Sequence, residues 1–406
     1  MYELTTASGK EDLEQVTSLV ARTFTNKGYW FFVDMRNGIH KKDPFFKPEH
    51  SHIVKYKGEV VSHIGIITKP MRLHGEKFVA GGIGDVVTHR QHRGKGLASR
   101  LMKQVVQFMQ DNEYDFSILS GIPNYYHRFG YIETLPVYRA DIETKYLKDI
   151  KSTYRIFPFQ EGKHTLVSEI YNDNFSRIQC SVIRPENYYY REHLDKETIL
   201  VYDENNNCKG YAVLWDTYET GFIIKEAGVL DHESFKAIVS YCFQRLQELS
   251  MDKMIVQMPP QTPFIEYLKD LHLNLQWSFP REKEGGKMGR FIQFYPLFKR
   301  LRSYYEKQLH HSPWQEDNFL FLIKTELGDV GFDYTNRSLK ILSSTGKKPD
   351  MTLEIGADLL FRFFTGYWNI QRFEARARVS LDKKVAQLLQ VLFPEKISFF
   401  SAVDYF

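Results

Sequence analysis

The sequence has few cysteines, and none of them stands in a pattern that binds metal or builds a disulfide framework. Among 406 residues there are three, Cys180, Cys208 and Cys242, which are widely spaced and odd in number. Zinc sites need paired or clustered cysteines, often with histidine, and small disulfide-rich folds need an even set. We therefore expect reduced packing or surface thiols and no metal site.

A long apolar run is also missing. No stretch of about 18 uncharged apolar residues occurs, as a membrane-spanning helix would require. The first residues, Met-Tyr-Glu-Leu-Thr-Thr, lack the basic region followed by an apolar run that marks a secretory signal. We expect a cytoplasmic protein with no membrane partner.

A strong charge of one sign is missing too. The formal net charge is +4, and basic residues are dispersed among acids. Because nucleic-acid-binding surfaces are strongly basic, this balance does not imply such a partner, and we expect none. The basic clusters at residues 90–93 and 299–302 are local features.

The length and composition instead favour a globular protein of several domains. At about 150 residues per domain, 406 residues suggest two or three. Hydrophobic residues make up 43% of the chain, which supplies ample apolar surface for a sizeable core.

The first part of the chain alternates strand and helix patterns. Apolar residues at helical spacing predict a helix over residues 11–24, and a second such face begins at Leu97 and continues to about Asn112. Runs rich in Val and Ile predict strands at residues 52–56, 60–68, 78–88 and 116–119. This order predicts an α/β sheet with a βαβ unit in its middle.

A similar order recurs further along. Strands are predicted at residues 210–215, 221–230 and 253–258, with a helix at 233–249. Between strand and helix this second copy has only Asp231 and His232, whereas the first copy has a longer basic segment with two glycines. We expect the second copy to lack a phosphate site and to be structural.

A charged, glycine-containing stretch at residues 281–289 predicts a linker before a third segment. That segment offers strand patterns at residues 319–327, 330–334 and 339–343, and helix patterns at 356–364 and 382–392. An α+β domain fits this pattern.

The motif that carries chemistry is Gln-His-Arg-Gly-Lys-Gly at residues 91–96, between a strand and a helix. A helix N-terminus leaves backbone N–H groups unpaired and carries partial positive charge, which suits a pyrophosphate. Gly94 and Gly96 lack side chains that would obstruct it, and Arg93, Lys95 and Arg90 add cations.

This segment resembles motif A of the GNAT (GCN5-related N-acetyltransferase) superfamily. In that family the strand before the loop binds the pantetheine arm of acetyl-CoA, which here implies Val86, Val87 and Thr88. The loop amides bind the pyrophosphate, which implies Arg93, Gly94, Lys95, Gly96, Leu97 and Ala98. Acetyl-CoA is thus the expected co-substrate.

A narrower resemblance lies at residues 126–131, Tyr-His-Arg-Phe-Gly-Tyr, which is similar to a segment of Eis-like (enhanced intracellular survival) acetyltransferases. That family implies an active GNAT domain, here residues 1–155, a degenerate GNAT domain, 156–290, and a sterol-carrier-like domain, 291–406. It also implies a small-molecule amine as acceptor, an aminoglycoside or another multi-amine cation, and a homo-hexamer.

The same resemblance implies two catalytic groups. Tyr126 corresponds to the general acid, and the α-carboxylate of Phe406, the last residue, to the general base. A tyrosine with its usual pKa of about 10 can protonate a departing thiolate at neutral pH. A terminal carboxylate has a usual pKa of about 3.3–3.7, and burial would raise this pKa toward the working range.

Four further residues are candidates for binding the amine. Trp30 and Asp34 lie in and beside an aromatic cluster after the first predicted helix, where GNAT domains place a substrate-covering loop. Aromatic rings and acids suit a polycation. Asp404, near the expected base, and Asp85, just before the expected CoA strand, are candidate counter-charges.

Two other functions remain open. One is a non-enzymatic module that responds to CoA or lipid through its third domain. The other is a nucleic-acid-associated protein that uses the basic loop, whose affinity would fall steeply with salt. Release of free CoA from acetyl-CoA in the presence of amines separates an enzyme from both.

Overall fold

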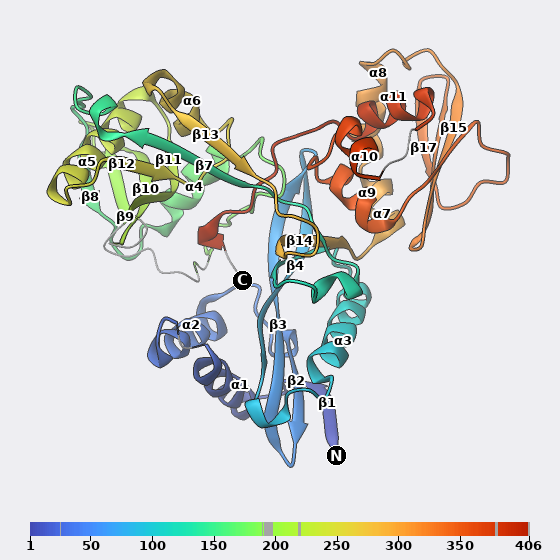
Figure 1. Ribbon diagram of the computed structural model, residues 1–406, viewed down its shortest axis with the longest axis horizontal. Helices are drawn as coiled ribbons and strands as arrows, with labels where there is room; N and C mark the ends of the chain where they lie inside the picture. The colour runs from blue at the N-terminus through green and yellow to red at the C-terminus, as the bar shows by residue number, and fades with distance from the viewer. Residues whose placement is uncertain (25, 189, 191–197, 218–220, 378–380, 405–406) are drawn as a thin grey trace.

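The protein is described by a computed structural model that covers residues 1–406 except 25, 189, 191–197, 218–220, 378–380 and 405–406. Over the described residues the strands form three sheets, two of seven strands and one of four. Helices pack against each sheet, so the prediction of a mixed α/β fold is confirmed (Figure 1). No helix in this part of the chain is long and apolar enough to span a membrane.

The first sheet has the strand order β1-β2-β3-β4-β5-β14-β6. Its strands are β1 (Tyr2–Thr6), β2 (Ser51–Tyr56), β3 (Glu59–Leu73), β4 (Glu76–Thr88), β5 (Phe116–Gly121), β6 (Ile132–Glu133) and β14 (Gly286–Phe291). Helices α1 (Lys10–Thr23) and α2 (Tyr29–Lys42) lie on one side of it and α3 (Leu97–Asp111) on the other (Figure 1). Each face has its own buried cluster, one built on α3 and one on α1 and α2.

The second sheet repeats this plan, with the order β8-β9-β10-β11-β12-β7-β13. Its strands are β7 (Val137–Glu143), β8 (Arg155–Pro158), β9 (Thr198–Tyr202), β10 (Cys208–Thr217), β11 (Gly221–Val229), β12 (Lys253–Val256) and β13 (Asn274–Ser278). Its helices are α4 (His164–Asn174), α5 (His232–Glu248) and α6 (Pro263–Leu268). In both sheets the fourth and fifth strands run parallel around a helix, α3 or α5, as the sequence predicts.

The two sheets exchange strands. After β6 the chain leaves the first sheet, and β7 pairs with β12 and β13 of the second sheet. After β13 the chain returns, and β14 inserts between β5 and β6 of the first sheet. The linker predicted at residues 281–289 is therefore wrong over residues 286–289, and residues 137–143 lie in the second sheet although the sequence assigns them to the first domain.

The third part of the chain packs helices on a four-stranded sheet of order β17-β16-β15-β18. The strands are β15 (Phe319–Thr325), β16 (Gly328–Thr335), β17 (Ser338–Leu342) and β18 (Met351–Glu354). The helices are α7 (Phe294–Arg300), α8 (Arg302–His310), α9 (Ala357–Phe364), α10 (Ile370–Ala377) and α11 (Lys383–Leu392). The predicted strands and both predicted helices here are confirmed.

The hairpin of β3 and β4 joins the three parts. Its two-residue turn, His74 and Gly75, has positive φ at both positions, which suits the twist of a tight hairpin. Figure 1 shows the hairpin rising between the part of the molecule built on the second sheet and the part built on the four-stranded sheet. Met71, Leu73 and Phe78 belong to the buried cluster that runs through both of these parts. The first sheet is thereby fixed against the rest of the molecule.

Candidate active site

Strands β4 and β5 separate at one end, and this separation defines the candidate site. Their parallel pairing begins at Ala80 and Phe116 and ends at Ile83 and Leu119. Strand β4 then continues for five more residues to Thr88, paired on its other side with β3. The edge of β4 over residues 84–88 is therefore open on the side where β5 lay, and it includes Val86, Val87 and Thr88.

A bulge in β4 marks the start of the open edge. The register with β3 shifts between His63 and Gly65, and Asp85 has φ +51°. Two contacts hold this bulge: the Arg36 guanidinium of α2 lies 2.7 Å from the Asp85 carboxylate, and a ring nitrogen of His63 lies 2.9 Å from the Asp85 carbonyl. Both charged side chains are buried. Asp85 is thus engaged with Arg36, a partner the sequence analysis missed.

The loop after β4 ends in an uncapped helix N-terminus. Gly96 is the N-cap of α3, in the left-handed conformation with φ +72°, and no side chain caps the helix. Gly94 also has a positive φ. A Cβ atom built on either glycine meets no atom within 4 Å, so this side of the loop faces open space. Backbone amides at the start of α3 can donate hydrogen bonds to an anion here.

Cationic side chains surround this helix end. Arg93 and Lys95 are exposed, and Leu97 is buried beneath them in the cluster under α3. Lys95 Nζ donates to the hydroxyl of Tyr2, 2.8 Å away, and Arg93 Nε donates to the Thr88 carbonyl. Both cations lie within reach of a phosphate at the loop, where they would add charge-assisted hydrogen bonds.

The equivalent helix end in the second sheet is closed by its own side chain. Asp231 is the N-cap of α5, its carboxylate accepts from the Ser234 amide at 2.8 Å, and the two residues form a capping box. An anion at this end would meet the negative charge of Asp231 instead of free amides. Of these two helix ends, the one at α3 is suited to a phosphate.

Tyr126 belongs to the buried cluster that contains the last paired residues of β4 and β5, Ile83 and Leu119. It begins a 3-10 turn, η3 (Tyr126–Phe129). The side chain is 6% exposed. Burial, followed by the neighbouring Tyr125 and Tyr131, raises the pKa of Tyr126, so its hydroxyl carries a proton at neutral pH.

Residues from distant parts of the chain support this turn. Arg290 of β14 donates to the Phe129 carbonyl, and His127 lies 2.9 Å from the buried carboxylate of Glu133. Glu133 is also paired with Arg362 of α9 in the third part of the chain. The sequence analysis found none of these supports, because Arg290 and Arg362 come from segments far away in sequence and local patterns do not reveal which side chains meet.

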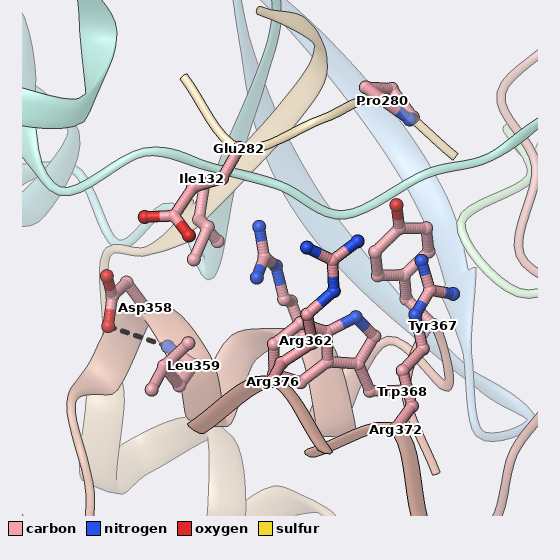
Figure 2. A pocket seen from close by; sticks show the side chains of 10 residues that line it. All are labelled: Ile132, Pro280, Glu282, Asp358, Leu359, Arg362, Tyr367, Trp368, Arg372 and Arg376. Atoms are coloured by element: carbon pink, nitrogen blue, oxygen red, sulfur yellow. Dashed lines mark hydrogen bonds between the residues drawn. The ribbon is translucent and has the colours of Figure 1, made fainter. Parts of the chain in front are cut away.

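A cavity of about 300 Å³ adjoins these supports (Figure 2). Arg362, Arg372 and Arg376 line it together with Tyr367 and Trp368, and Asp358 and Glu282 stand opposite. Figure 2 shows the three guanidinium groups gathered on one side of the cavity. Because like charges repel, this wall disfavours a cationic amine, so we do not assign the acceptor to this cavity.

The two candidate residues near the N-terminus lie on helix α2, where the sequence analysis expected a substrate-covering loop. Phe32, Met35 and Ile39 form the buried face of this helix, a spacing that would have predicted it. Trp30, 72% exposed, and Asp34, also exposed, are four residues apart and share the other face. The Arg36–Asp85 pair ties this helix to the bulge of β4.

Of the two candidates at the C-terminus, Asp404 and Phe406, the structure describes only Asp404. Asp404 is buried and its carboxylate accepts hydrogen bonds from Arg184 and Tyr188, so both of its oxygens are engaged. Phe406 lies outside the described residues.

Comparisons with known proteins agree with this geometry. Residues 6–133 match the family model of the GNAT acetyltransferase domain, which covers the open strand edge, the loop and Tyr126. A search of curated proteins found no match.

Solved structures share the fold over the whole chain. A protein of unknown function from Enterococcus faecalis V583, named a probable N-acyltransferase, aligns over all of both chains with a TM-score of 0.76 and 16% identity. A GCN5-related N-acetyltransferase from Anabaena variabilis gives 0.73 and 14%, and Eis1 from Mycobacterium abscessus 0.69 and 13%, again over all of both chains. Residues 6–133 are thus identified as a GNAT acetyltransferase domain, and the fold of the whole chain is shared with these three structures, Eis1 among them.

Proposed function

We propose that this protein is an N-acetyltransferase that moves the acetyl group of acetyl-CoA directly to a primary amine. The observation that carries the proposal is the open edge of β4 at residues 84–88, which leads straight into the uncapped, glycine-containing start of α3. An extended arm and a pyrophosphate need these two features side by side.

The open edge suits the pantetheine arm of CoA. Val86, Val87 and Thr88 lie in the part of β4 that continues after its pairing with β5 has ended, so backbone groups of alternate residues there face the side from which β5 has withdrawn. An extended chain with amide groups can pair with such an edge as an added strand does. The arm would then run along β4 toward the buried cluster that contains Tyr126.

The loop suits the pyrophosphate. Amides of residues 93–98 lie in the loop and at the start of α3, where the helix dipole favours negative charge. The open space beside Gly94 and Gly96 admits phosphate oxygens close to the backbone, and Arg93 and Lys95 supply paired cations.

The reaction needs a proton acceptor and a proton donor. The amine nitrogen attacks the thioester carbonyl carbon, a C–N bond forms, and the C–S bond breaks. The leaving thiolate takes a proton from the Tyr126 hydroxyl, whose raised pKa keeps it protonated beforehand. The proton of the attacking amine passes to the α-carboxylate of Phe406 in this proposal. No covalent enzyme intermediate is needed.

The acceptor is an aminoglycoside or another multi-amine cation. Trp30 and Asp34 support this choice, since an exposed aromatic ring and a carboxylate on one helix face suit a cation. Asp85 contributes indirectly, because its ion pair with Arg36 orients that helix. The Eis-like fold also leads us to propose a homo-hexamer, which light scattering of the purified protein tests.

A lipid-binding role for the third part of the chain is less well supported. Its interior is filled by aromatic rings, such as Phe298 against Phe364 with centroids 5.6 Å apart and Tyr305 against Phe332 at 5.3 Å. A surface cavity of about 760 Å³ has charged and amide side chains in its wall beside apolar ones, namely Asp317, Asn318, Asp350, Lys384, Gln387 and Gln390 beside Pro313, Trp314, Phe319, Met351 and Val391. An acyl chain or sterol requires apolar walls instead.

Mass spectrometry of the acceptor tests the proposed function. The protein is incubated with acetyl-CoA and a panel of aminoglycosides, polyamines and monoamines. We expect multi-amine acceptors to gain an acetyl group on nitrogen while CoA is released. A panel left unmodified, with acetyl-CoA intact, would contradict the proposal.

A further inference from the structure

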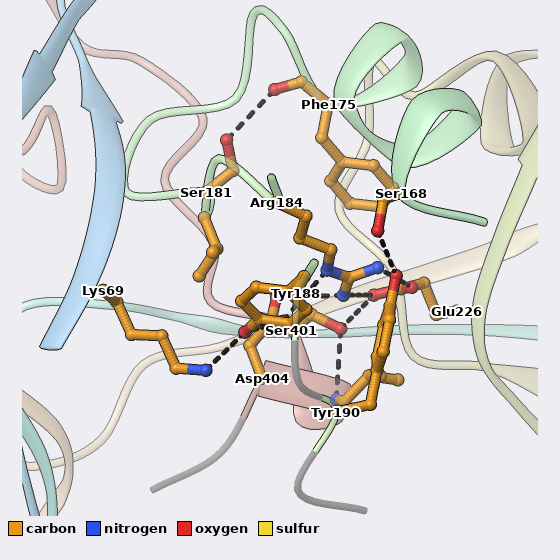
Figure 3. A network of polar contacts seen from close by, with 12 residues as sticks. Lys69, Ser168, Phe175, Ser181, Arg184, Tyr188, Tyr190, Glu226, Ser401 and Asp404 are labelled. Carbon is orange, nitrogen blue, oxygen red and sulfur yellow. Dashed lines mark hydrogen bonds and ion pairs between the residues drawn. The ribbon is translucent and has the colours of Figure 1, made fainter. Parts of the chain in front are cut away.

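A buried ionic network holds the last turn of the chain (Figure 3). The guanidinium of Arg184 donates to both oxygens of Glu226 on β11, each at 2.8 Å. It also donates to both oxygens of Asp404, each at 3.0 Å, through Nε and Nη2. The three side chains have no exposed surface. One arginine thus joins the second sheet to the turn η6 (Ala402–Asp404).

Tyr188 extends this network to the first sheet. Its hydroxyl donates to Asp404 Oδ1 at 2.7 Å and accepts from Lys69 Nζ, a buried group on β3. Burial and the Asp404 charge raise the pKa of Tyr188 well above its usual value, so the hydroxyl stays a donor. Hydrogen bonds therefore run without a gap from β3, in the GNAT domain, to Asp404.

The other end of η6 is fixed as well. Ser401 donates to Glu226, and the Val403 amide donates to Ser401 Oγ. Chain ends usually fray because few contacts offset their entropy. Here displacing η6 would leave Arg184 and Glu226 buried with an incomplete set of partners, and burying unpaired charge is costly. The network gives this turn a single position.

We propose that Arg184 and Tyr188 are positioning residues that hold the end of the chain at the GNAT domain so that its terminal carboxylate can act there. This inference rests on the proposed function, in which that carboxylate is the base. Phe406 follows Asp404 by two residues, and two residues span at most about 7 Å. An anchor at Asp404 therefore limits the reach of the terminus to a small volume.

Arg184 and Asp404 are 220 residues apart. If the network only stabilised the fold, loosening it would lower the resistance to unfolding and nothing else. A positioning role predicts more: loosening the anchor should lower kcat and leave the KM for acetyl-CoA unchanged, because the CoA loop lies elsewhere. It should also expose the C-terminal residues to carboxypeptidase in the folded protein.

The test compares two tyrosines that lie against the same arginine. Tyr188→Phe removes the hydroxyl that bridges Lys69 and Asp404. Tyr171→Phe is the matched control, since the Tyr171 ring stacks on Arg184 with 3.5 Å from guanidinium carbon to ring centroid. The Tyr171 hydroxyl is buried, and among the described residues it has no hydrogen-bond partner.

We expect Tyr188→Phe to lower kcat about tenfold, as loss of one hydrogen bond to a charged group implies, without changing the KM for acetyl-CoA. Carboxypeptidase should release its C-terminal residues faster than those of the wild type. Tyr171→Phe should match the wild type in both measurements. Asp404→Asn, which keeps the shape of the side chain, should show the same lower kcat and faster release as Tyr188→Phe. It replaces Tyr188→Phe in the test if that variant does not fold.

Wild-type carboxypeptidase resistance in both Tyr188→Phe and Asp404→Asn would overturn the inference, whatever their kcat. So would a wild-type kcat in a variant whose C-terminus is released faster. The digestion needs no turnover. If the wild type acetylates no amine, the proposed function fails, and the digestion still decides whether the network anchors the chain end.

Discussion

Arg184 donates two hydrogen bonds of 3.0 Å to the carboxylate of Asp404, although 220 residues separate the two in sequence. The same guanidinium binds Glu226, so one cation is paired with two buried carboxylates. Glycine-rich loops that bind phosphate are fixed by local sequence. The end of this chain, in contrast, is held by a contact that only the tertiary fold creates.

Arg184→Met is expected to be strongly destabilising. Removing the cation leaves Glu226 and Asp404 buried and unpaired, which costs about 3–5 kcal/mol. Arg337→Met is the control, because the Arg337–Glu316 pair is more than half exposed and contributes about 0–1 kcal/mol. Calorimetric melting of both variants checks this. Equal losses of stability would show that the buried network adds nothing.

Gly96→Ala is expected to weaken acetyl-CoA binding selectively. The new methyl group enters the open space beside the helix end, where we propose that phosphate oxygens approach the backbone. Loss of one charge-assisted hydrogen bond, about 1.5–3 kcal/mol, raises the KM for acetyl-CoA at least about tenfold.

The control for this substitution is Gly162→Ala. Gly162 also has a positive φ and open space around it, but it lies in a turn before α4 in the second part of the chain. Both alanines carry similar backbone strain of about 1–2 kcal/mol. If the two variants show the same KM for acetyl-CoA, the loop at Gly96 is not the phosphate site.

His74 is expected to make stability depend on acid pH. Burial, with a smaller effect of Lys396, lowers the pKa of His74 to about 3, while one ring nitrogen lies 2.8 Å from the Phe364 carbonyl of α9. Its usual pKa is about 6.5. Between these values the unfolded chain binds a proton that the folded chain does not, so stability falls as pH drops from about 6.5 toward 3.

His74→Gln removes this titration and keeps a donor for Phe364. From pH 6.5 to pH 5 the wild type should lose about 1.6 kcal/mol more than the variant, because the slope grows from half of about 1.4 kcal/mol per pH unit at pH 6.5 to nearly all of it at pH 5. The other buried histidines, such as His52 and His63, are common to both proteins. Denaturant unfolding at both pH values measures the difference, and parallel losses would refute the assignment to His74.

Residues added after Phe406 are expected to abolish transfer and leave the fold intact. In the proposed reaction the terminal carboxylate accepts the proton, and an added residue converts it to a neutral amide. A short C-terminal tag, compared with the same tag at Met1, isolates this effect. Wild-type kcat with a C-terminal tag and wild-type melting in both proteins would exclude the terminal carboxylate as base.

Local patterns predicted the parts of the site that are contiguous in sequence. Strand β4, the loop and α3 follow one another, and a run rich in Val and Ile, two glycines and helical spacing mark each in turn. Helix α2 was within reach of the same reasoning through Phe32, Met35 and Ile39, but the resemblance to GNAT domains led us to expect a substrate-covering loop there.

Long-range pairing was beyond local patterns. Strands β7 and β14 are exchanged between two sheets of like design, and the local pattern of a strand does not say which of two sheets it joins. The same holds for the partners of Asp85, Glu133 and Asp404, each an arginine far away in sequence. A charged residue near an expected site can equally be a counter-charge or half of a buried pair, and only its neighbours decide.

The release of free CoA by wild type and by Tyr126→Phe tests the central claim most directly. With acetyl-CoA and a multi-amine acceptor, we predict that the wild type releases CoA well above background and that Tyr126→Phe lowers kcat by about 10² or more at unchanged KM. Tyr125→Phe, which removes a neighbouring buried hydroxyl, should stay near wild type. Release at background by the wild type, or equal release by Tyr126→Phe, would contradict an acetyltransferase that uses Tyr126 as its acid.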